Sequence, residues 1–249
     1  RGRGMATVKQ INPHSPLPTL SLHDILSVYF LSWRYTFVGI NQKEAIAALH
    51  WERMLTAAEE LFQQKGFEQT TIDDISKASG YSRRTLYAYF VNKEDFLRQI
   101  VRKGLAQLDG ALEAALRRET FEERYFAACE AVLHYLRDCP QSAKQVRQVQ
   151  PEKLDGGNRT VQEILTLGQQ INGRLSEMIR QGQKEGSVRE TLHPERCVVV
   201  LWSALSGWND TLQNQGAFLA ERFHLSQSEF QREALEQLLS SLRKEKTPE

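Results

Sequence analysis

Apolar residues recur along most of this chain at the three- to four-residue spacing of α-helices. Between residues 41 and 65, Leu55, Ala58 and Phe62 share one helical face, and Gly66 suits the left-handed position that follows a helix. No stretch shows the sustained alternation of a β-strand, so the pattern predicts an all-α protein. Further helices are predicted at 71–78, at 82–90, from 92 onward, and at 104–118, 121–138, 159–185, 194–214 and 228–245.

The first forty residues differ from the rest of the chain. Residues 5–20 hold three prolines among polar residues, which predicts an extended or disordered arm. Residues 21–38 carry an apolar stripe that predicts a short helix packed on the body. The alternative is a surface for a lipid or a partner protein, which deletion of 21–38 would test. The four residues before Met5 are expected to be an artificial addition.

Two of the short helices are joined by the three-residue turn Ser79-Gly80-Tyr81. Gly80 can adopt the positive φ angle that a sharp turn between helices needs. In the helix that follows, Leu86 and Phe90 lie four residues apart and are expected to face inward. This arrangement predicts a helix-turn-helix.

The opposite face of that helix carries groups that suit DNA. Arg83, Arg84 and Tyr87 are expected to point outward, and an arginine can donate two hydrogen bonds to the edge of guanine. Lys93 opens the next helix, where its charge and the backbone amides favour a phosphate. The alternative is an ordinary solvated surface. The glycine turn and the cationic face together favour DNA binding.

The run from Phe67 to Phe90 resembles the DNA-binding signature of the TetR (tetracycline-repressor) family. Ala57-Ala58 and Leu61-Phe62 before the run, and Asn92-Lys93-Glu94 after it, agree in register with the same signature. The resemblance covers roughly residues 48–100.

The resemblance implies a three-helix, homeodomain-like module that binds double-stranded operator DNA, with Arg83, Arg84 and Tyr87 approaching bases. Arg84 stands where many members carry a small residue, so a base preference is not carried over. Trp51 stands near the position where members often carry a basic residue that opens the first helix, which puts a phosphate contact there in doubt. The residues implied to contact the phosphate backbone are Thr71, Thr85, Tyr87, Tyr89 and Lys93.

Similar proteins bury a small ligand among their C-terminal helices and form homodimers through the last two long helices, which here correspond to 194–214 and 228–245. The expected domains are an N-terminal extension over 1–40, a helix-turn-helix domain over 41–95, and a helical ligand-binding and dimerisation domain over 96–249. The resemblance implies a repressor that a small-molecule effector releases from DNA. An activator is the alternative.

Candidate ligand-binding residues are aromatic or polar groups on apolar helical faces. A drug-sized site is mostly apolar with a few placed polar groups. The alternative is that a neighbouring backbone group satisfies each of these polar residues. The candidates are Tyr125, Cys129, His134, Gln169, Asn172, Trp202 and Asn209. Little net charge in this region argues against a highly charged ligand.

Composition narrows the function further. The chain of 249 residues holds 32 Lys and Arg against 31 Asp and Glu, so a DNA contact must come from a local basic surface. Neither the three cysteines nor the six histidines have the spacing of metal ligands. The sequence also contains no nucleophile elbow and no phosphate-binding loop. We therefore expect no enzyme, metal or cofactor.

A thiol switch through Cys129, Cys139 or Cys197 is the alternative sensor. Without an apolar run of about 20 residues, a cytoplasmic protein with no membrane partner is expected.

Overall fold

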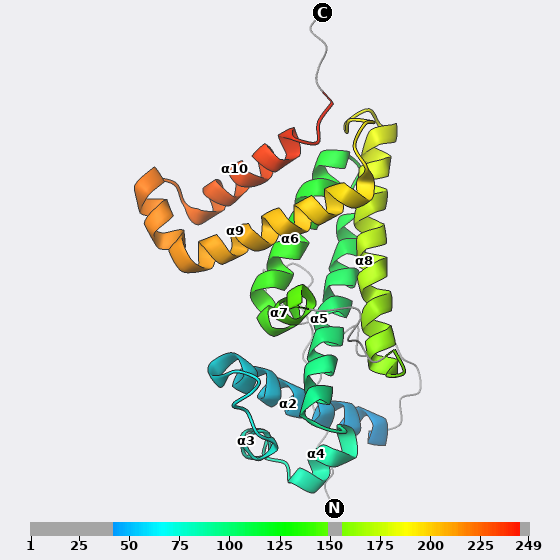
Figure 1. Ribbon diagram of the computed structural model, residues 1–249, viewed down its shortest axis with the longest axis vertical. Helices are drawn as coiled ribbons and strands as arrows, with labels where there is room; N and C mark the ends of the chain where they lie inside the picture. Colours follow the sequence, from blue (N-terminus) through cyan, green and yellow to red (C-terminus); the bar gives the residue numbers. More distant parts are fainter. Residues whose placement is uncertain (1–41, 149–155, 245–249) are drawn as a thin grey trace, which may run out of the picture. The chain divides into compact units, whose positions relative to one another are not determined.

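The computed structural model describes residues 42–148 and 156–244, whose regular structure is helical (Figure 1). The prediction of an all-α protein is confirmed. The chain divides into two units, Arg1–Leu49 and His50–Glu249, and only the first turns of one helix are described in the first unit. The expected extension over 1–40, with its helix at 21–38, lies outside the described residues. The described helices are α2 (Gln42–Lys65), α3 (Ile72–Ser79), α4 (Arg83–Tyr89), α5 (Lys93–Ala115), α6 (Phe121–Asp138), α7 (Pro140–Gln148), α8 (Arg159–Lys184), α9 (Pro194–Phe223) and α10 (Gln227–Ser240).

Two helices in the middle of the chain differ from the prediction. The helix from residue 92 and the helix at 104–118 are one continuous helix, α5. Gly104 lies inside it and allows a close approach to α7, because a Cβ there would lie 2.7 Å from the Ser142 Oγ atom. Helix α7 was not predicted: it lies between the predicted helices at 121–138 and 159–185, and Pro140 opens it at a position where a missing N–H costs nothing.

The last two helices also have different lengths from those predicted. Helix α9 continues nine residues beyond the predicted end at 214 and stops where His224 adopts a left-handed conformation, with φ of 55°. Helix α10 ends at Ser240 rather than at 245. Its start is as predicted, because Ser226 and Glu229 form a capping box. Both corrections concern helix ends, which amphipathic spacing defines poorly.

The buried apolar side chains of His50–Glu249 form two clusters. The smaller cluster joins α2 to the start of α5, and the larger fills the space among α5, α6, α8, α9 and α10. Members of the smaller core are Met54, Leu55, Ala58, Phe62, Ile75, Leu86, Phe90, Phe96 and Ile100. The larger core runs from Val101 to Leu242 along the chain.

Helix α5 contributes to both cores. Phe96 and Ile100 belong to the smaller core, whereas Val101 and Leu105 belong to the larger one. Figure 1 shows α5 running beside α6 and α8, with which it makes extensive contacts. A movement of α5 therefore affects both cores. In the described part of the chain, no helix combines the length and hydropathy of a membrane span.

Candidate nucleic-acid interface and helical cavity

The turn between α3 and α4 has the geometry that its sequence predicts. Gly80 adopts φ of 75°, and its N–H donates to the Ser76 carbonyl oxygen at 3.1 Å. The Ser76 hydroxyl donates to the carbonyl oxygen of Tyr81 at 2.6 Å. These two bonds fix the angle at which α4 leaves the turn, because both join the end of α3 to the turn itself.

Helix α4 separates an inward and an outward face. Leu86 and Phe90 are buried in the smaller core, and the Phe90 ring stacks on Phe96 with 3.8 Å between ring centroids. Arg83 and Arg84 lie exposed in the first turn, which the Ser82 hydroxyl caps by accepting a hydrogen bond from the Thr85 N–H. The structure therefore presents both guanidinium groups at the helix N-terminus.

The two arginines are not equivalent. The Arg83 Nε and Nη2 atoms donate to the two carboxylate oxygens of Asp73 on α3. This pairing raises the pKa of the Arg83 guanidinium. It also occupies the donor edge that would bind guanine. The structure gives Arg84 no ion pair or hydrogen bond with the described residues, so its donors are available to a partner.

The other predicted DNA-contacting residues differ in exposure. Tyr87 is 55% exposed beside the arginines, and Thr71 is exposed at the start of α3. Thr85 and Tyr89 are half-buried, and Tyr89 packs against the smaller core. Tyr87 and Thr71 are thus accessible to DNA from the protein surface, whereas Thr85 and Tyr89 offer less of their side chains.

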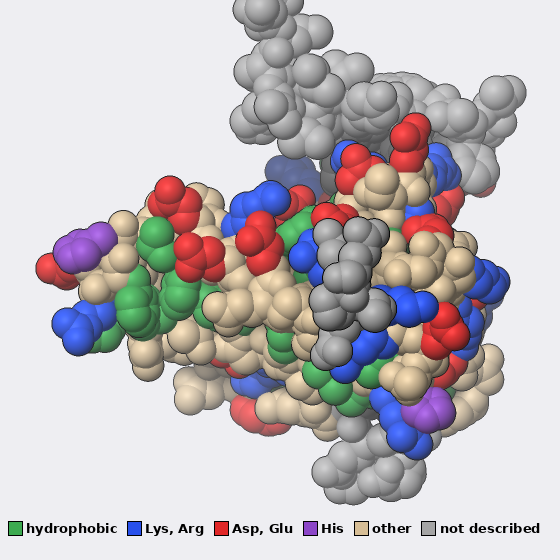
Figure 2. All heavy atoms as spheres, turned by 90° about the horizontal axis from the view of Figure 1, so that it is seen from above, with side chains coloured by type: hydrophobic (Ala, Val, Ile, Leu, Met, Phe, Trp, Pro, Cys, Tyr) green, Lys and Arg blue, Asp and Glu red, His purple; other side chains and the backbone are tan. Residues whose placement is uncertain are grey.

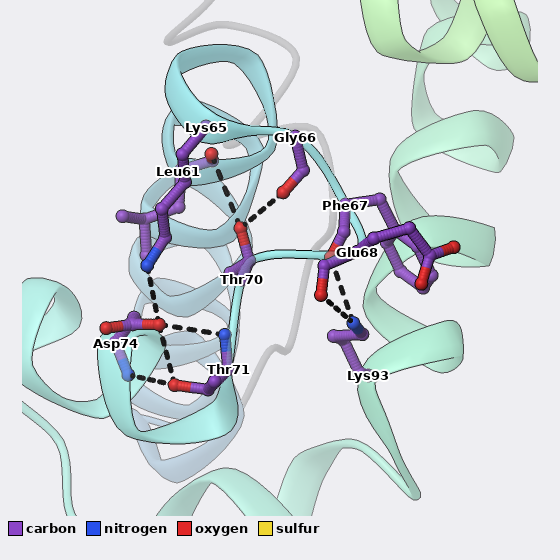
Figure 3. A network of polar contacts seen from close by, with 9 residues as sticks. All are labelled: Leu61, Lys65, Gly66, Phe67, Glu68, Thr70, Thr71, Asp74 and Lys93. Atoms are coloured by element: carbon purple, nitrogen blue, oxygen red, sulfur yellow. Dashed lines mark hydrogen bonds and ion pairs between the residues drawn. The ribbon is translucent and has the colours of Figure 1, made fainter.

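A network of polar contacts holds the connection between α2 and α3 (Figure 3). The Asp74 carboxylate accepts hydrogen bonds from the Thr71 N–H at 2.8 Å and the Thr71 hydroxyl at 2.6 Å, and it pairs with the Lys65 Nζ atom at 2.6 Å. The Lys65 contact, then the Thr71 bonds, hold the pKa of Asp74 well below its usual range. This carboxylate therefore stays ionised, and continues to cap α3, at an acidic pH where an ordinary aspartate would be protonated.

Lys93 belongs to the same network rather than projecting freely. Its Nζ atom donates to the Phe67 carbonyl oxygen at 2.9 Å and to the Glu68 carbonyl oxygen at 3.4 Å (Figure 3). The ammonium group also lies 4.2 Å from the centroid of the Phe67 ring. Lys93 thus joins the start of α5 to the segment before α3, a structural role that the sequence analysis missed.

A cavity of about 810 Å³, partly open to solvent, lies beside the larger core among α5, α7, α8 and α9. Most of the area of its wall is apolar. Three predicted ligand-binding residues, Gln169, Asn172 and Trp202, line it, and the Trp202 Nε1–H donates to the Asn172 Oδ1 atom at 3.2 Å. The structure therefore brings these three together.

The other four predicted ligand-binding residues lie elsewhere. The Tyr125 hydroxyl donates to the Leu235 carbonyl oxygen at 3.0 Å within the packed core, where Cys129 is also buried. His134 is exposed, and its Nδ1 atom lies 3.7 Å from the Asp138 Oδ2 atom. Asn209 lines a separate, more polar hollow near α10. Helical spacing placed Tyr125, Cys129 and Asn209 on buried faces correctly but could not show that the cavity lies against other faces.

Sequence reasoning also missed two arginines in the cavity wall, Arg98 and Arg147. The available signal was that Arg98 lies between Leu97 and Val101, which also line the cavity. A charge next to an apolar stripe is usually solvated, so spacing by itself did not single it out.

The three cysteines lie in surroundings that suppress thiolate formation. Burial raises the pKa of Cys129 to about 12 and that of Cys139 to about 11, and it also raises the pKa of Cys197. Because the thiolate is the reactive form, this argues against a thiol switch. Among residues 42–148 and 156–244, no group of three His, Cys, Asp or Glu side chains could hold a metal ion.

Oxidation is therefore expected to leave DNA affinity unchanged. With a pKa of about 12, about one Cys129 thiol in ten thousand is ionised at pH 8, so hydrogen peroxide should react slowly. Anisotropy titration of labelled DNA before and after peroxide treatment measures the effect. A loss of affinity that dithiothreitol reverses would instead establish the redox sensor.

Comparisons with known proteins agree with this arrangement. Residues 54–100 match the family model for bacterial regulatory proteins of the tetR family. YfiR of Bacillus subtilis, an uncharacterized HTH-type transcriptional regulator, is 44% identical over 52 residues, which cover 21% of this chain and 25% of YfiR. YhgD of the same organism, also an uncharacterized HTH-type regulator, is 28% identical over 141 residues, which cover 55% of this chain and 70% of YhgD. The first match thus spans only a quarter of its relative's length.

A solved structure shows the same fold over most of the chain. The transcriptional regulator FadR of Bacillus subtilis, solved in complex with stearoyl-CoA, superposes with a TM-score of 0.59 and 18% identity. The superposition covers 78% of this chain and 100% of the FadR chain. The family match, by contrast, is confined to 54–100, where the smaller core and both helices of the turn lie.

Proposed function

Because residues 54–100 match the tetR family of bacterial regulatory proteins, we propose that this chain is a dimeric DNA-binding regulator of transcription. In this proposal a small molecule releases the protein from its operator. The observation that carries the proposal is the glycine-hinged helix pair, with Arg84 and Tyr87 exposed on α4 while Leu86 anchors the helix inward. An exposed cationic helix N-terminus can enter a major groove. We further propose that the protein acts on DNA in the cytoplasm.

Dimerisation through α9 and α10 is supported by exposed apolar side chains. On α9, Val199 and Val200 are 66% and 62% exposed, and Phe218 and Phe223 are more than half exposed. Figure 2 shows hydrophobic side chains gathered where α9 passes toward α10. Such a surface is typical of a contact with another protein chain. A second copy would cover it with the same surface, as two-fold dimers do.

Helix α5 is the proposed link between effector and DNA. Its residues Val101 and Leu105 line the cavity, and its first residue, Lys93, follows α4 after a three-residue connection. A ligand that fits better when α5 is tilted would favour that conformation. The tilt would change the spacing of the two recognition helices in the dimer, and DNA affinity would fall.

Selection of duplexes from a random library by the wild-type protein tests DNA recognition directly. We expect enrichment of a two-fold symmetric sequence whose half-sites lie about 10 base pairs apart, or a multiple of that spacing, because each subunit would enter one major groove. The control is an unrelated duplex of equal length at the same salt concentration. Absence of any enriched sequence would contradict the proposal. Transcription in vitro from a promoter carrying the selected site then distinguishes repression from activation.

A further inference from the structure

The charge of the cavity wall differs from that of the protein as a whole. The described wall contains Arg98 and Arg147 and no aspartate or glutamate, within a surface that is mainly apolar by area. A ligand that fills such a space needs an apolar body, and a negative group would compensate the cations. The net charge of +1 over the full sequence does not indicate this local positive charge.

Arg147 already has a partner, whereas Arg98 is poorly satisfied. The Arg147 Nη1 atom donates to the Asp210 carboxylate at 3.0 Å. The Arg98 Nε atom is buried and has no hydrogen-bond partner among the described residues. A buried donor without an acceptor is costly, so a conformation in which Arg98 gains an acceptor for this atom is favoured.

The other donors of Arg98 reach only the beginning of its own helix. Its Nη2 atom lies 3.4 Å from the Asn92 Oδ1 atom and 3.5 Å from the Asp95 Oδ1 atom, both longer than a usual hydrogen bond. Asn92 and Asp95 form the start of α5, where Asn92 Oδ1 accepts from the Asp95 N–H at 2.9 Å and the second Asp95 oxygen accepts from the Val91 N–H at 3.2 Å. Arg98 therefore touches both the cavity and the connection from α4.

We propose that the effector is an aliphatic anion, an apolar chain with a negatively charged head group, and that the Arg98 guanidinium group turns away from its present contacts to bind the head group. A carboxylate or phosphate accepts two parallel hydrogen bonds from one edge of a guanidinium group. Binding withdraws Arg98 from Asn92 and Asp95 and so changes the contacts at the start of α5. This inference rests on the proposed function, because it names the effector class of the same cavity.

A matched series of compounds tests the head group. Dodecanoate, 1-dodecanol and dodecyltrimethylammonium share one apolar chain and differ in charge, and dodecanoyl-CoA carries its anionic groups as phosphates. Affinities are measured on DNA-free protein by calorimetry, below the concentrations at which the compounds form micelles. We expect at least one anion to bind ten-fold or more tightly than the alcohol and the cation. Preference for the free acid or the thioester identifies the source of the anionic group.

Variants assign the contact to Arg98. Arg98→Met, which keeps an apolar side chain of similar length, should reduce the preference for the anion over the alcohol to about one-fold while still binding the alcohol. Arg102→Met is the matched control on the same helix, because Arg102 is outside the cavity wall and pairs with Glu163. It should retain the ten-fold preference. The anion should lower operator affinity of the wild type by a larger factor than that of Arg98→Met, each relative to its own ligand-free value.

Three results would overturn the inference: binding of no compound in the series, equal binding of anion and alcohol by the wild type, or an anion preference that survives Arg98→Met. All three are read on protein without DNA. A failure to select any operator would instead count against the proposed function, so the two failures are distinguishable.

Discussion

Replacement of Leu86 by aspartate is expected to abolish DNA binding while the larger core stays folded. Leu86 is 1% exposed at the centre of the smaller core. Truncation of a buried leucine to alanine costs about 2–5 kcal/mol, and a carboxylate at the same place adds the desolvation of a charge. A core of nine buried residues cannot absorb this loss, so α4 should detach from the residues that orient it.

Three measurements check this expectation. DNA affinity by anisotropy should fall below detection, circular dichroism should retain most of the helical signal, and limited proteolysis should leave a resistant fragment containing α6 to α10. Leu86→Ala is the uncharged comparison and should give a smaller loss, which shows whether the effect comes from packing or from a negative charge near DNA. Complete loss of helical signal for Leu86→Asp would mean that the two clusters unfold as one unit.

The double substitution Arg83→Ala and Arg84→Ala is expected to weaken operator binding at least about thirty-fold, because each arginine–guanine pair with two hydrogen bonds is worth about 1–3 kcal/mol of discrimination. Of the single variants, Arg84→Ala should have the larger effect. Arg83 must first leave Asp73, whereas Arg84 has no partner in the described part of the chain. Titration of the selected operator and of an unrelated duplex measures affinity and specificity together.

The matched control is Arg117→Ala with Arg159→Ala, which removes the same charge from two highly exposed side chains on α8 and after α5. This control should change operator affinity less than three-fold at physiological salt, because neither arginine lies on α3 or α4 and the charges of exposed side chains are largely screened. Equal weakening by both double variants would show that only overall charge matters, and the assignment of α4 as the recognition helix would then be wrong.

Features that depend on neighbouring residues could be predicted from the sequence. The positive φ of Gly80, the caps at Thr71 and Ser82 and the inward direction of Leu86 follow from local conformational preference and helical periodicity. The family signature added the function of this module. Helix ends were less predictable, as α9 shows, because its last turns depend on the neighbours it meets.

Features that join distant residues were decided by tertiary structure. The Arg83–Asp73 pair depends on the crossing of two helices, and the bond from Lys93 to the Phe67 carbonyl joins residues 26 positions apart. The Tyr125 hydroxyl reaches Leu235 across 110 positions, which places Tyr125 in the packed core and not in the wall of the cavity.

The cavity is the feature that the sequence predicted least well. Periodicity showed that this chain is helical and which side of α4 is buried, because those properties repeat within a few residues. It could not show that α5, α7, α8 and α9 line one cavity or that Arg98 lies in its wall. That space depends on how several helices pack against one another, and packing selects the partner of each buried face among many apolar stripes that look alike in the sequence.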